Sequence, residues 1–173
     1  MARASPGADV FLFARQTVAD DLIREALAAG PETQAVILGA GLDTSGVRIG
    51  AERRAAGLSP GTFFEVDLPA MQEEKRRIAV RLAGRYDDAH VAYVPCSFGE
   101  GELTSALQAA GFDPARPSVW VWSGVIHYLT EAAVRETLTD LRALDMVKLY
   151  EARTGRPASS RGTPWANLAV ASM

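Results

Sequence analysis

Two glycines that directly follow an apolar stretch are the most informative residues of the sequence. Residues 35–38, Ala-Val-Ile-Leu, have the composition of a buried strand in a parallel sheet. Glycine lets the backbone turn sharply and approach a ligand closely, and doubly wound sheets bind ligands beyond the carboxyl ends of their strands. The sequence therefore predicts a ligand-binding turn made by Gly39, Ala40, Gly41, Leu42 and Asp43.

Acidic residues stand at the end of the next predicted strand. This strand covers residues 62–66, with Glu65 inside it, and Asp67 follows directly. A carboxylate at such a strand end can accept hydrogen bonds from the hydroxyls of a ribose. Asp67 is the first candidate for this role and Glu65 is the second. Asp67 also fits a cap of the following helix, and Glu65 also fits a position that faces solvent.

The third glycine of a dinucleotide-binding fingerprint is missing, because Thr44 stands in its position and Gly46 follows only later. This change removes the close helix approach that seats a pyrophosphate on a helix N-terminus. A nicotinamide-dependent oxidoreductase is therefore disfavoured. An adenosine-containing ligand without a pyrophosphate fits better, and S-adenosyl-L-methionine is the common ligand of that kind.

Apolar stretches alternate with helical patterns along most of the chain. Strands are predicted at residues 35–38, 62–66, 91–95 and 118–122. Helices are predicted at residues 17–29, 44–57 in part, 68–82, 103–110 and 130–144. This alternation predicts an α/β fold with a doubly wound, mostly parallel, Rossmann-like sheet and helices on both faces.

The helix predicted over residues 68–82 has an amphipathic pattern. Met71, Ile78 and Leu82 are expected to face the sheet. The charged run from Glu73 to Arg77 is expected to face mostly solvent. This helix should therefore cover the sheet with apolar side chains and present its charges to water.

The chain is expected to form a single domain with a less regular end. Residues 1–16 are predicted to be an N-terminal arm, residues 17–144 the core, and residues 145–173 an atypical C-terminal segment. That last segment is rich in glycine, proline and serine. Two short apolar pieces within it, residues 147–150 and 168–171, each fit a strand.

Composition excludes several classes of partner and site. The net charge of −3 disfavours nucleic acid as a partner, and no apolar stretch reaches the roughly 20 residues of a membrane span. Cys96 is the only cysteine, so an intramolecular disulfide and a Cys-rich zinc site are both excluded. With two histidines in addition, no metal centre is expected. A cytoplasmic location and a small-molecule partner fit this composition.

Several further motifs accompany the glycine turn in a fixed order. They are Arg15, Val36 to Thr44, Phe64 to Pro69 with Lys75 and Arg76, Gly111 to Pro114, and Val121 to Val134. In order and spacing, these motifs resemble the leucine carboxyl methyltransferase family over residues 11–144. The resemblance implies an S-adenosyl-L-methionine-dependent methyltransferase that methylates a carboxylate or hydroxyl of a small metabolite.

The resemblance also implies roles for individual residues of the cofactor site. Arg15 matches the arginine that pairs with the methionine carboxylate of the cofactor, a contact that suits a bidentate guanidinium. Gly39 and Gly41 match the glycines of the cofactor turn. Asp67 matches the acid that holds the ribose hydroxyls.

Three serines stand where the family usually has charged residues. Ser45 replaces an arginine, and Ser123 replaces a glutamate. Ser97, which precedes Phe98, replaces an aspartate that binds the adenine amine. Serine still forms hydrogen bonds, but it supplies no negative charge beside a sulfonium, and each lost acceptor is expected to cost about 1–3 kcal/mol of cofactor binding. Ser97, Phe98 and Ser123 are retained as candidate cofactor contacts.

The candidate catalytic residues are His127 and Tyr128, which follow the fourth predicted strand. A carboxylate acceptor is already ionised at neutral pH, so methyl transfer to it requires no strong general base. For a phenol acceptor, the histidine is a candidate to remove the proton. A packed, hydrogen-bonded core histidine is the other interpretation of His127.

The resemblance further implies strands and a helix beyond residues 130–144. Residues 145–173 are too few to form all of them, so some C-terminal elements are expected to be missing, through an internal deletion or a frame change near Asp145. A sheet without its last strands has an open edge, which can pair with another chain to form a homodimer. The alternative function is a catalytically impaired methyltransferase-like binding or assembly protein.

Overall fold

The computed structural model describes residues 8–82, 87–143 and 168–171 of the 173-residue chain. Its helices are α1 (Ala8–Ala29), α2 (Ser45–Ala55), α3 (Pro69–Arg81), α4 (Leu103–Ala109), α5 (Glu131–Ala143) and the short 3-10 helix η1 (Ile126–Tyr128). Its strands are β1 (Gln34–Leu38), β2 (Thr62–Asp67), β3 (Val91–Pro95), β4 (Ser118–Ser123) and β5 (Leu168–Ala171). Strands and helices alternate through residues 34–143, as the sequence predicts.

The strands form one five-stranded sheet in the order β3-β2-β1-β4-β5, and neighbouring strands pair in parallel. The chain runs outward from β1 through β2 to β3 and then returns to β4 on the other side of β1. This reversal makes the carboxyl ends of β1 and β4 the topological switch point, where doubly wound sheets bind ligands. Leu38 of β1 is in register with Val66 of β2 and Trp122 of β4, so the three strand ends lie level.

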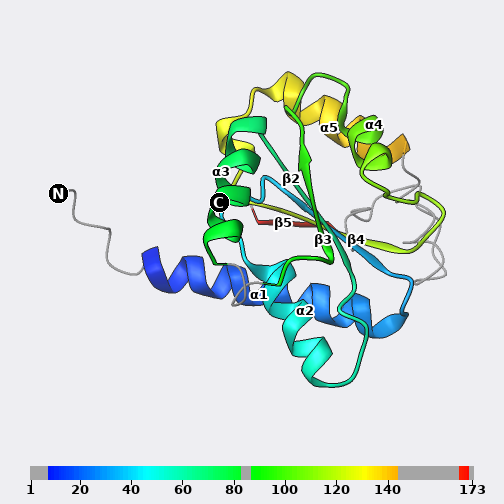
Figure 1. Ribbon diagram of the computed structural model, residues 1–173. Helices are drawn as coiled ribbons and strands as arrows, with labels where there is room; N and C mark the ends of the chain where they lie inside the picture. Colours follow the sequence, from blue (N-terminus) through cyan, green and yellow to red (C-terminus); the bar gives the residue numbers. More distant parts are fainter. Residues whose placement is uncertain (1–7, 83–86, 144–167, 172–173) are drawn as a thin grey trace, which may run out of the picture.

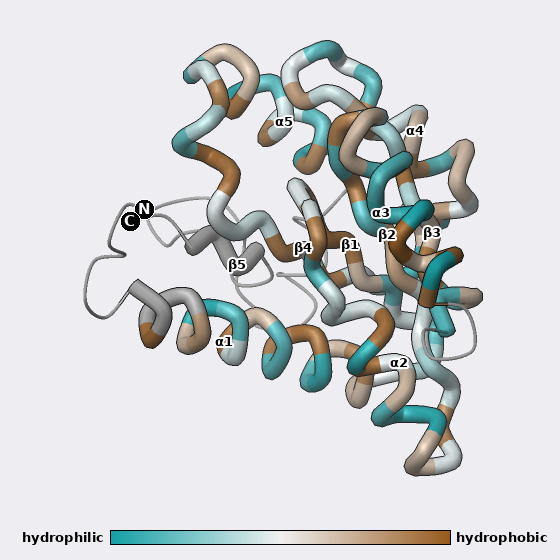
Figure 2. The backbone as a smooth tube through the Cα atoms, turned by 60° about the vertical axis from the view of Figure 1, so that its left-hand side comes forward, coloured by the Kyte–Doolittle hydropathy of each residue, from teal (hydrophilic) through white to brown (hydrophobic). Residues whose placement is uncertain are grey.

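Helices cover both faces of the sheet, as Figure 1 shows, with α4 and α5 on one face and α1 and α2 on the other. The first face has a core that includes Phe64 and Trp120, and the second has a core that includes Ile23 and Phe63. Phe63 and Phe64 are neighbours in β2 and point to opposite faces, because side chains alternate along a strand. Figure 2 shows hydrophobic residues along β1 and β4 at the centre of the sheet. The predicted α/β architecture is confirmed.

Helix α1 is longer than the sequence predicts, because it begins at Ala8 and not at Thr17. No glycine or proline occurs within it, so the backbone can continue as helix throughout. Its first turns extend away from the sheet (Figure 1), and Val10 and Phe13 are 68% and 78% exposed. The apolar residues of this part of the sequence, Val10 to Phe13, are consecutive and lack helical spacing, so the pattern does not predict these turns.

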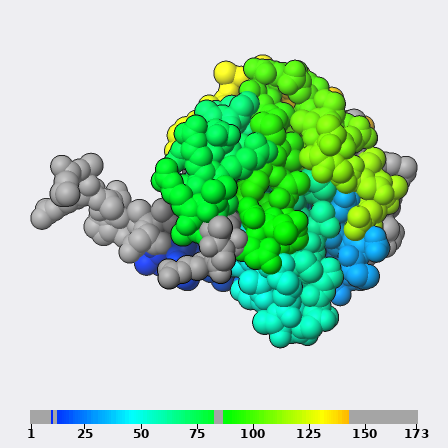
Figure 3. Space-filling view, in the orientation of Figure 1, coloured from blue at the N-terminus to red at the C-terminus, as the bar shows by residue number. Residues whose placement is uncertain are grey.

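The buried face of α3 also differs from the predicted one. Figure 3 shows α3, in green, at the surface of the molecule. The prediction that Met71 and Leu82 face the sheet is wrong, since they are 38% and 41% exposed. Instead, α3 buries Gln72, Lys75 and Ala79. The apolar pattern misleads because a carboxylate of β2 lies beneath α3 and pairs with the lysine ammonium.

The last described strand follows the prediction for residues 168–171. It forms β5 and pairs in parallel with β4, from Trp120 opposite Leu168 to Ser123 opposite Ala171. The strand predicted at residues 147–150 lies outside the described residues. The deletion expected near Asp145 and the homodimer both stay predictions.

Candidate functional site

The glycine turn lies at the carboxyl end of β1, at the switch point of the sheet. The N–H groups of Gly39 and Ala40 donate to the carbonyl of Val66 in β2, at 2.8 and 3.0 Å. The N–H of Asp43 donates to the carbonyl of Ala40 at 2.7 Å and closes the turn. Gly39 and Gly41 have φ angles of 68° and 47°, in the left-handed region that favours glycine. The sharp turn expected from the sequence is therefore present.

The two glycines of the turn differ in their surroundings. A Cβ atom on Gly39 would lie 2.1 Å from Cγ2 of Val125, which follows β4, so close packing as well as φ requires glycine there. A Cβ atom on Gly41 would meet no described atom within 4 Å. Gly39 therefore joins the ends of β1 and β4, whereas Gly41 borders open space that a ligand can occupy.

Asp67 lies at the end of β2, beside this open space. Its Oδ2 accepts the N–H of Gly41 at 2.6 Å, and its Oδ1 accepts the N–H of Leu68 at 2.7 Å. A carboxylate can accept about four hydrogen bonds, so these two leave capacity for a pair of ligand hydroxyls. Leu68 itself is the N-cap of α3, and no side chain caps that helix end. The alternative in which Asp67 serves as the helix cap is therefore wrong.

Helix α1 crosses the site and contacts the loops after β1 and β4. A Cβ atom on Gly124, after β4, would lie 2.9 Å from both terminal guanidinium nitrogens of Arg15. The next residue, Gln16, donates from Nε2 to Oδ2 of Asp43 at 3.1 Å and to Oγ of Ser45 at 2.7 Å. The helix thus brings Arg15 to the switch point, although it lies far from the other site residues in sequence.

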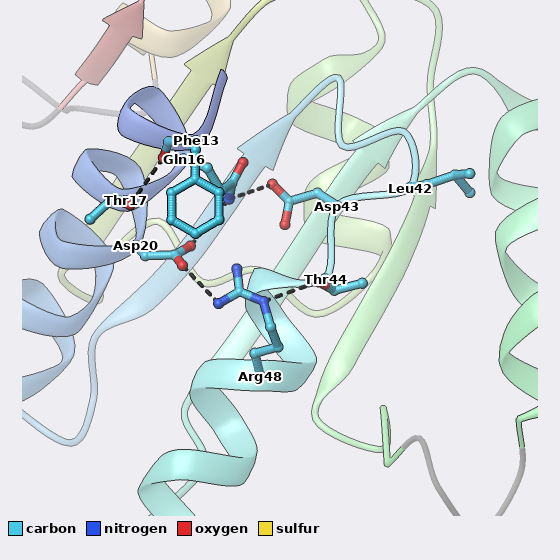
Figure 4. Close-up of a pocket in the computed structure, with 8 residues that line it drawn as sticks. All are labelled: Phe13, Gln16, Thr17, Asp20, Leu42, Asp43, Thr44 and Arg48. Carbon is cyan, nitrogen blue, oxygen red and sulfur yellow. Dashed lines mark hydrogen bonds and ion pairs between the residues drawn. The ribbon is translucent and has the colours of Figure 1, made fainter. Parts of the chain in front are cut away.

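A pocket of about 470 Å³ lies between α1 and the glycine turn (Figure 4). Its lining residues are Phe13, Gln16, Thr17, Asp20, Leu42, Asp43, Thr44 and Arg48. Arg48 pairs with Asp20 at 2.8 Å, and Asp20 accepts the hydroxyl of Ser45 at 2.7 Å. Burial by itself raises the pKa of Asp20, but hydrogen bonds from Arg48, Ser45 and Gln16 hold it below its ordinary value. This ionised carboxylate fastens α1 to the start of α2.

Ser97, Phe98 and Ser123 also lie at this edge of the sheet. Ser123 is the last residue of β4, and Ser97 follows closely after the end of β3. The ring of Phe98 lies against that of Trp122, with centroids 6.0 Å apart. The fold therefore gathers these three side chains near the strand ends, and their contacts with a cofactor stay predictions.

Glu65 lies away from this surface, inside the protein. Its side chain has no exposed area and forms an ion pair with the ammonium of Lys75. Burial raises the pKa of Glu65 to about 7, against the opposing effect of Lys75. The interpretation of Glu65 as a solvent-facing residue is wrong. A carboxylate buried in this way cannot reach a ligand at the sheet edge, so we leave Glu65 out of the proposed ribose contacts.

Sequence reasoning missed Lys75 as a residue of the site. A lysine within a run of charges on a helix normally faces water, and this one is 3% exposed. The signal that could have found it is Glu65, an acid that stands between the apolar residues Phe64 and Val66 inside β2. Such a buried carboxylate needs a compensating charge, and a helix packed on the strand is the natural place for it.

His127 and Tyr128 lie on η1, two and three residues after Val125. Both are exposed, Tyr128 by 83% of its area, and their ring centroids are 5.3 Å apart. The interpretation of His127 as a packed core histidine is therefore wrong. The two side chains extend from the loop that touches the glycine turn through Val125.

The described residues offer neither a metal site nor a membrane-spanning helix. Within residues 8–82, 87–143 and 168–171, no three His, Cys, Asp or Glu side chains gather closely enough to hold a metal ion. None of the described helices is both long enough and apolar enough to cross a membrane.

Several mycobacterial proteins are similar to this chain in sequence. A protein of Mycolicibacterium gilvum is 37% identical over 133 residues, which are 75% of this chain and 40% of that protein. A protein of Mycobacteroides abscessus is 36% identical over 140 residues, 77% of this chain and 41% of that protein. One of Mycobacterium tuberculosis is 40% identical over 98 residues, 56% of this chain and 29% of that protein. All three are named as S-adenosyl-L-methionine-dependent methyltransferases.

The matched part of the chain spans about two fifths of the length of the Mycolicibacterium gilvum and Mycobacteroides abscessus relatives. A family model described as leucine carboxyl methyltransferase matches residues 1–142. The matched region contains the glycine turn, Asp67, Arg15 and the loop after β4, which are the parts that form the site. The chain therefore belongs to the leucine carboxyl methyltransferase family.

Proposed function

We propose that this chain binds S-adenosyl-L-methionine at the ends of β1, β2 and β4 and catalyses methyl transfer from it. The proposed acceptor is an oxygen of a carboxylate or hydroxyl on a small metabolite. The observation that carries the proposal is the open space beside Gly41, bordered by the Asp67 carboxylate with its spare acceptor capacity. The names of the relatives agree with this cofactor.

The residues present suit the chemistry of this cofactor. Asp67 would accept hydrogen bonds from the two ribose hydroxyls, while its bond from the Gly41 N–H keeps the turn in place. Arg15, which α1 brings to Gly124, would pair with the carboxylate of the methionine portion. Ser97, Phe98 and Ser123 would contact the remaining parts of the cofactor from the ends of β3 and β4.

When bound, S-adenosyl-L-methionine supplies a methyl group on a positively charged sulfur. The protein contributes alignment and exclusion of water. Val125, in the loop after β4, packs closely against the glycine turn. A carboxylate acceptor would arrive ionised, whereas the proton of a hydroxyl acceptor would go to the exposed imidazole of His127, with Tyr128 beside it.

The second candidate function is a catalytically impaired methyltransferase-like binding or assembly protein. It is favoured by Ser97 and Ser123, which stand at strand ends without a negative charge to offer a sulfonium. A measurement of methyl transfer distinguishes the two functions. Binding of cofactor without turnover on any carboxylate or hydroxyl acceptor would favour the second function.

The first test is calorimetric titration of the purified chain with S-adenosylhomocysteine, the product form of the cofactor. We expect a dissociation constant of about micromolar, and at least about ten-fold weaker binding by Gly41→Ala, whose Cβ enters the ligand space. Gly57→Ala is the matched control, since Gly57 has a φ of 72° and also meets no described atom within 4 Å. A folded wild-type chain that does not bind would contradict the proposal.

A further inference from the structure

Lys75 of α3 lies between a buried carboxylate and the glycine turn. Its Nζ pairs with Glu65 of β2 and donates to the carbonyl oxygen of Asp43 at 2.6 Å. The lysine side chain is 4% exposed and the glutamate side chain 0%. An ammonium buried to this degree requires compensating groups. One of its two partners, Glu65, lies in β2, and the other, the Asp43 carbonyl, lies in the glycine turn.

The surroundings of the ion pair leave it little freedom. The side-chain amide of Gln72 donates to the carbonyl of Glu65 at 2.6 Å, which holds α3 on β2. A Cβ atom on Gly46 would lie 3.2 Å from Oε1 of Glu65, so the start of α2 packs closely on the carboxylate. The Lys75 ammonium also lies 5.9 Å from the ring centroid of Tyr93 in β3. The ammonium is therefore aimed at the turn from a fixed position.

Asp43, the last residue of the glycine turn, is held at its carboxylate and at its main-chain carbonyl, in addition to the N–H bond that closes the turn. Its carboxylate accepts hydrogen bonds from the Gln16 side chain at 3.1 Å and from the Ser45 N–H at 2.5 Å. Its main-chain carbonyl accepts the bond from Lys75. The bond from the Ser45 N–H closes a ring that contains the peptide between Asp43 and Thr44, and the Lys75 contact holds the carbonyl oxygen of that same peptide from the side of α3.

We propose that Lys75 is a positioning residue for the cofactor turn, with Glu65 as the buried carboxylate that compensates its charge. The inference rests on the proposed function in naming the ligand of this turn. Buried ion pairs add little net stability, because desolvation offsets their attraction. The role of this pair is to fix the Asp43 carbonyl. The fixed carbonyl holds the backbone of the turn in the conformation that leaves the space beside Gly41 open.

Three variants separate positioning from stability: Lys75→Met, Glu65→Gln and the double variant. Each is titrated with S-adenosylhomocysteine and unfolded with urea at a pH of about 8, above the pKa of Glu65. Lys75→Met should lose stability, since it leaves a buried carboxylate without its partner, and should bind at least about ten-fold more weakly. Glu65→Gln keeps the bond to Asp43 and should bind within about three-fold of wild type.

The double variant decides between the two roles. It has no uncompensated buried charge, so its stability should return close to that of wild type. Its affinity should stay at least about ten-fold weaker, because the bond to the Asp43 carbonyl is still missing. Recovery of affinity together with stability would overturn the proposal. Arg76→Met, which removes a cation that donates to the Tyr93 carbonyl at 2.9 Å, is the matched control and should bind like wild type.

Hydrogen exchange without ligand provides a second readout. The N–H groups of Gly41, Asp43 and Ser45 are all hydrogen-bonded, so they should be protected in wild type. In the double variant they should exchange faster, while amides in β1 and β2 stay unchanged. Equal exchange of the turn in both proteins would overturn the role of Lys75. If wild type fails to bind S-adenosylhomocysteine, the proposed function fails, yet the exchange measurement still decides this inference.

Discussion

The glycine turn and the loop after β4 (residues 124–129) border the proposed cofactor site from two sides, and the fold holds them in different ways. Three elements fix the turn through polar contacts, α1 through Gln16, β2 through Asp67 and α3 through Lys75. The loop after β4 is packed on the turn by the apolar side chain of Val125 and then leads to exposed residues.

This difference has a physical consequence for what each side can do. Hydrogen bonds accept a narrow range of distances and angles, so polar contacts from three directions hold the turn in one conformation. Apolar packing has no directional requirement, and it tolerates small rearrangements. Under the proposed function, the turn suits a cofactor of constant shape, and the loop with His127 and Tyr128 suits an acceptor that approaches from solvent.

The contact that joins the two sides should give the largest effect when it is disturbed. Gly39→Ala adds a Cβ that would lie 2.1 Å from Val125, at a φ of 68°. We expect a loss of about 2–4 kcal/mol in the free energy of unfolding, measured in urea. Gly57→Ala, at a φ of 72° but in open space, should lose only about 1–2 kcal/mol.

The double variant Gly39→Ala with Val125→Ala tests whether overlap causes the extra loss. It removes the atoms that would collide, so it should recover part of the stability, while the cost of the positive φ remains. If Gly39→Ala and Gly57→Ala were equally stable, close packing would not join the turn to the loop after β4.

On the turn side, Asp67→Asn should weaken S-adenosylhomocysteine binding by about 10- to 100-fold. The amide offers one acceptor atom in place of two and no charge, and bonds to charged groups contribute about 1.5–3 kcal/mol each. Isothermal titration measures the change. Asp113→Asn is the matched control, because Asp113 also accepts a backbone N–H, that of Ala115 at 2.9 Å, at a distance from the site in sequence and fold. Equal affinities of both variants and wild type would exclude Asp67 from the cofactor contacts.

The buried pair behind the turn should make stability depend on pH. The pKa of Glu65 is raised from 4.5 to about 7, so the folded protein binds this proton more tightly than the unfolded chain does. The stability that comes from this carboxyl is present at low pH and is lost as the pH rises through about 7. Relative to Glu65→Gln, wild type should lose at least about 1 kcal/mol between pH of about 5 and about 8. Parallel pH profiles of the two proteins in urea unfolding would contradict this expectation.

On the loop side, His127→Ala should have the smallest effect on the fold and on cofactor affinity. The side chain is exposed, so stability should change by less than about 0.5 kcal/mol, and S-adenosylhomocysteine should bind as in wild type. Methyl transfer to a hydroxyl acceptor should slow by about 100-fold, and transfer to a carboxylate acceptor should not change. Full activity on a hydroxyl acceptor would remove the role of His127 as a base.

Sequence patterns were sufficient for the elements that are buried on both faces. The stretch 35–38, followed by Gly39, predicted β1 and its turn, because a central parallel strand is apolar throughout and must end where the chain changes direction. Patterns failed at α1 and α3 for opposite reasons. The first turns of α1 expose Val10 and Phe13 and lack the periodicity seen from Val18 onward. Helix α3 has an amphipathic pattern, but it buries Gln72, Lys75 and Ala79 in place of the apolar residues of that pattern.

The sequence by itself determined the glycine turn, the acid that ends β2 and the alternation of strands and helices typical of a parallel sheet, since each depends on local backbone preference and burial. The tertiary structure decided that Asp67, and not Glu65, serves that edge, because Asp67 ends β2 and accepts the Gly41 N–H, whereas Glu65 is buried beneath α3 and pairs with Lys75. It also decided that Lys75 reaches the turn. Such contacts join residues distant in sequence, and their free energy depends on burial and charge compensation that exist only after the helices have packed on the sheet.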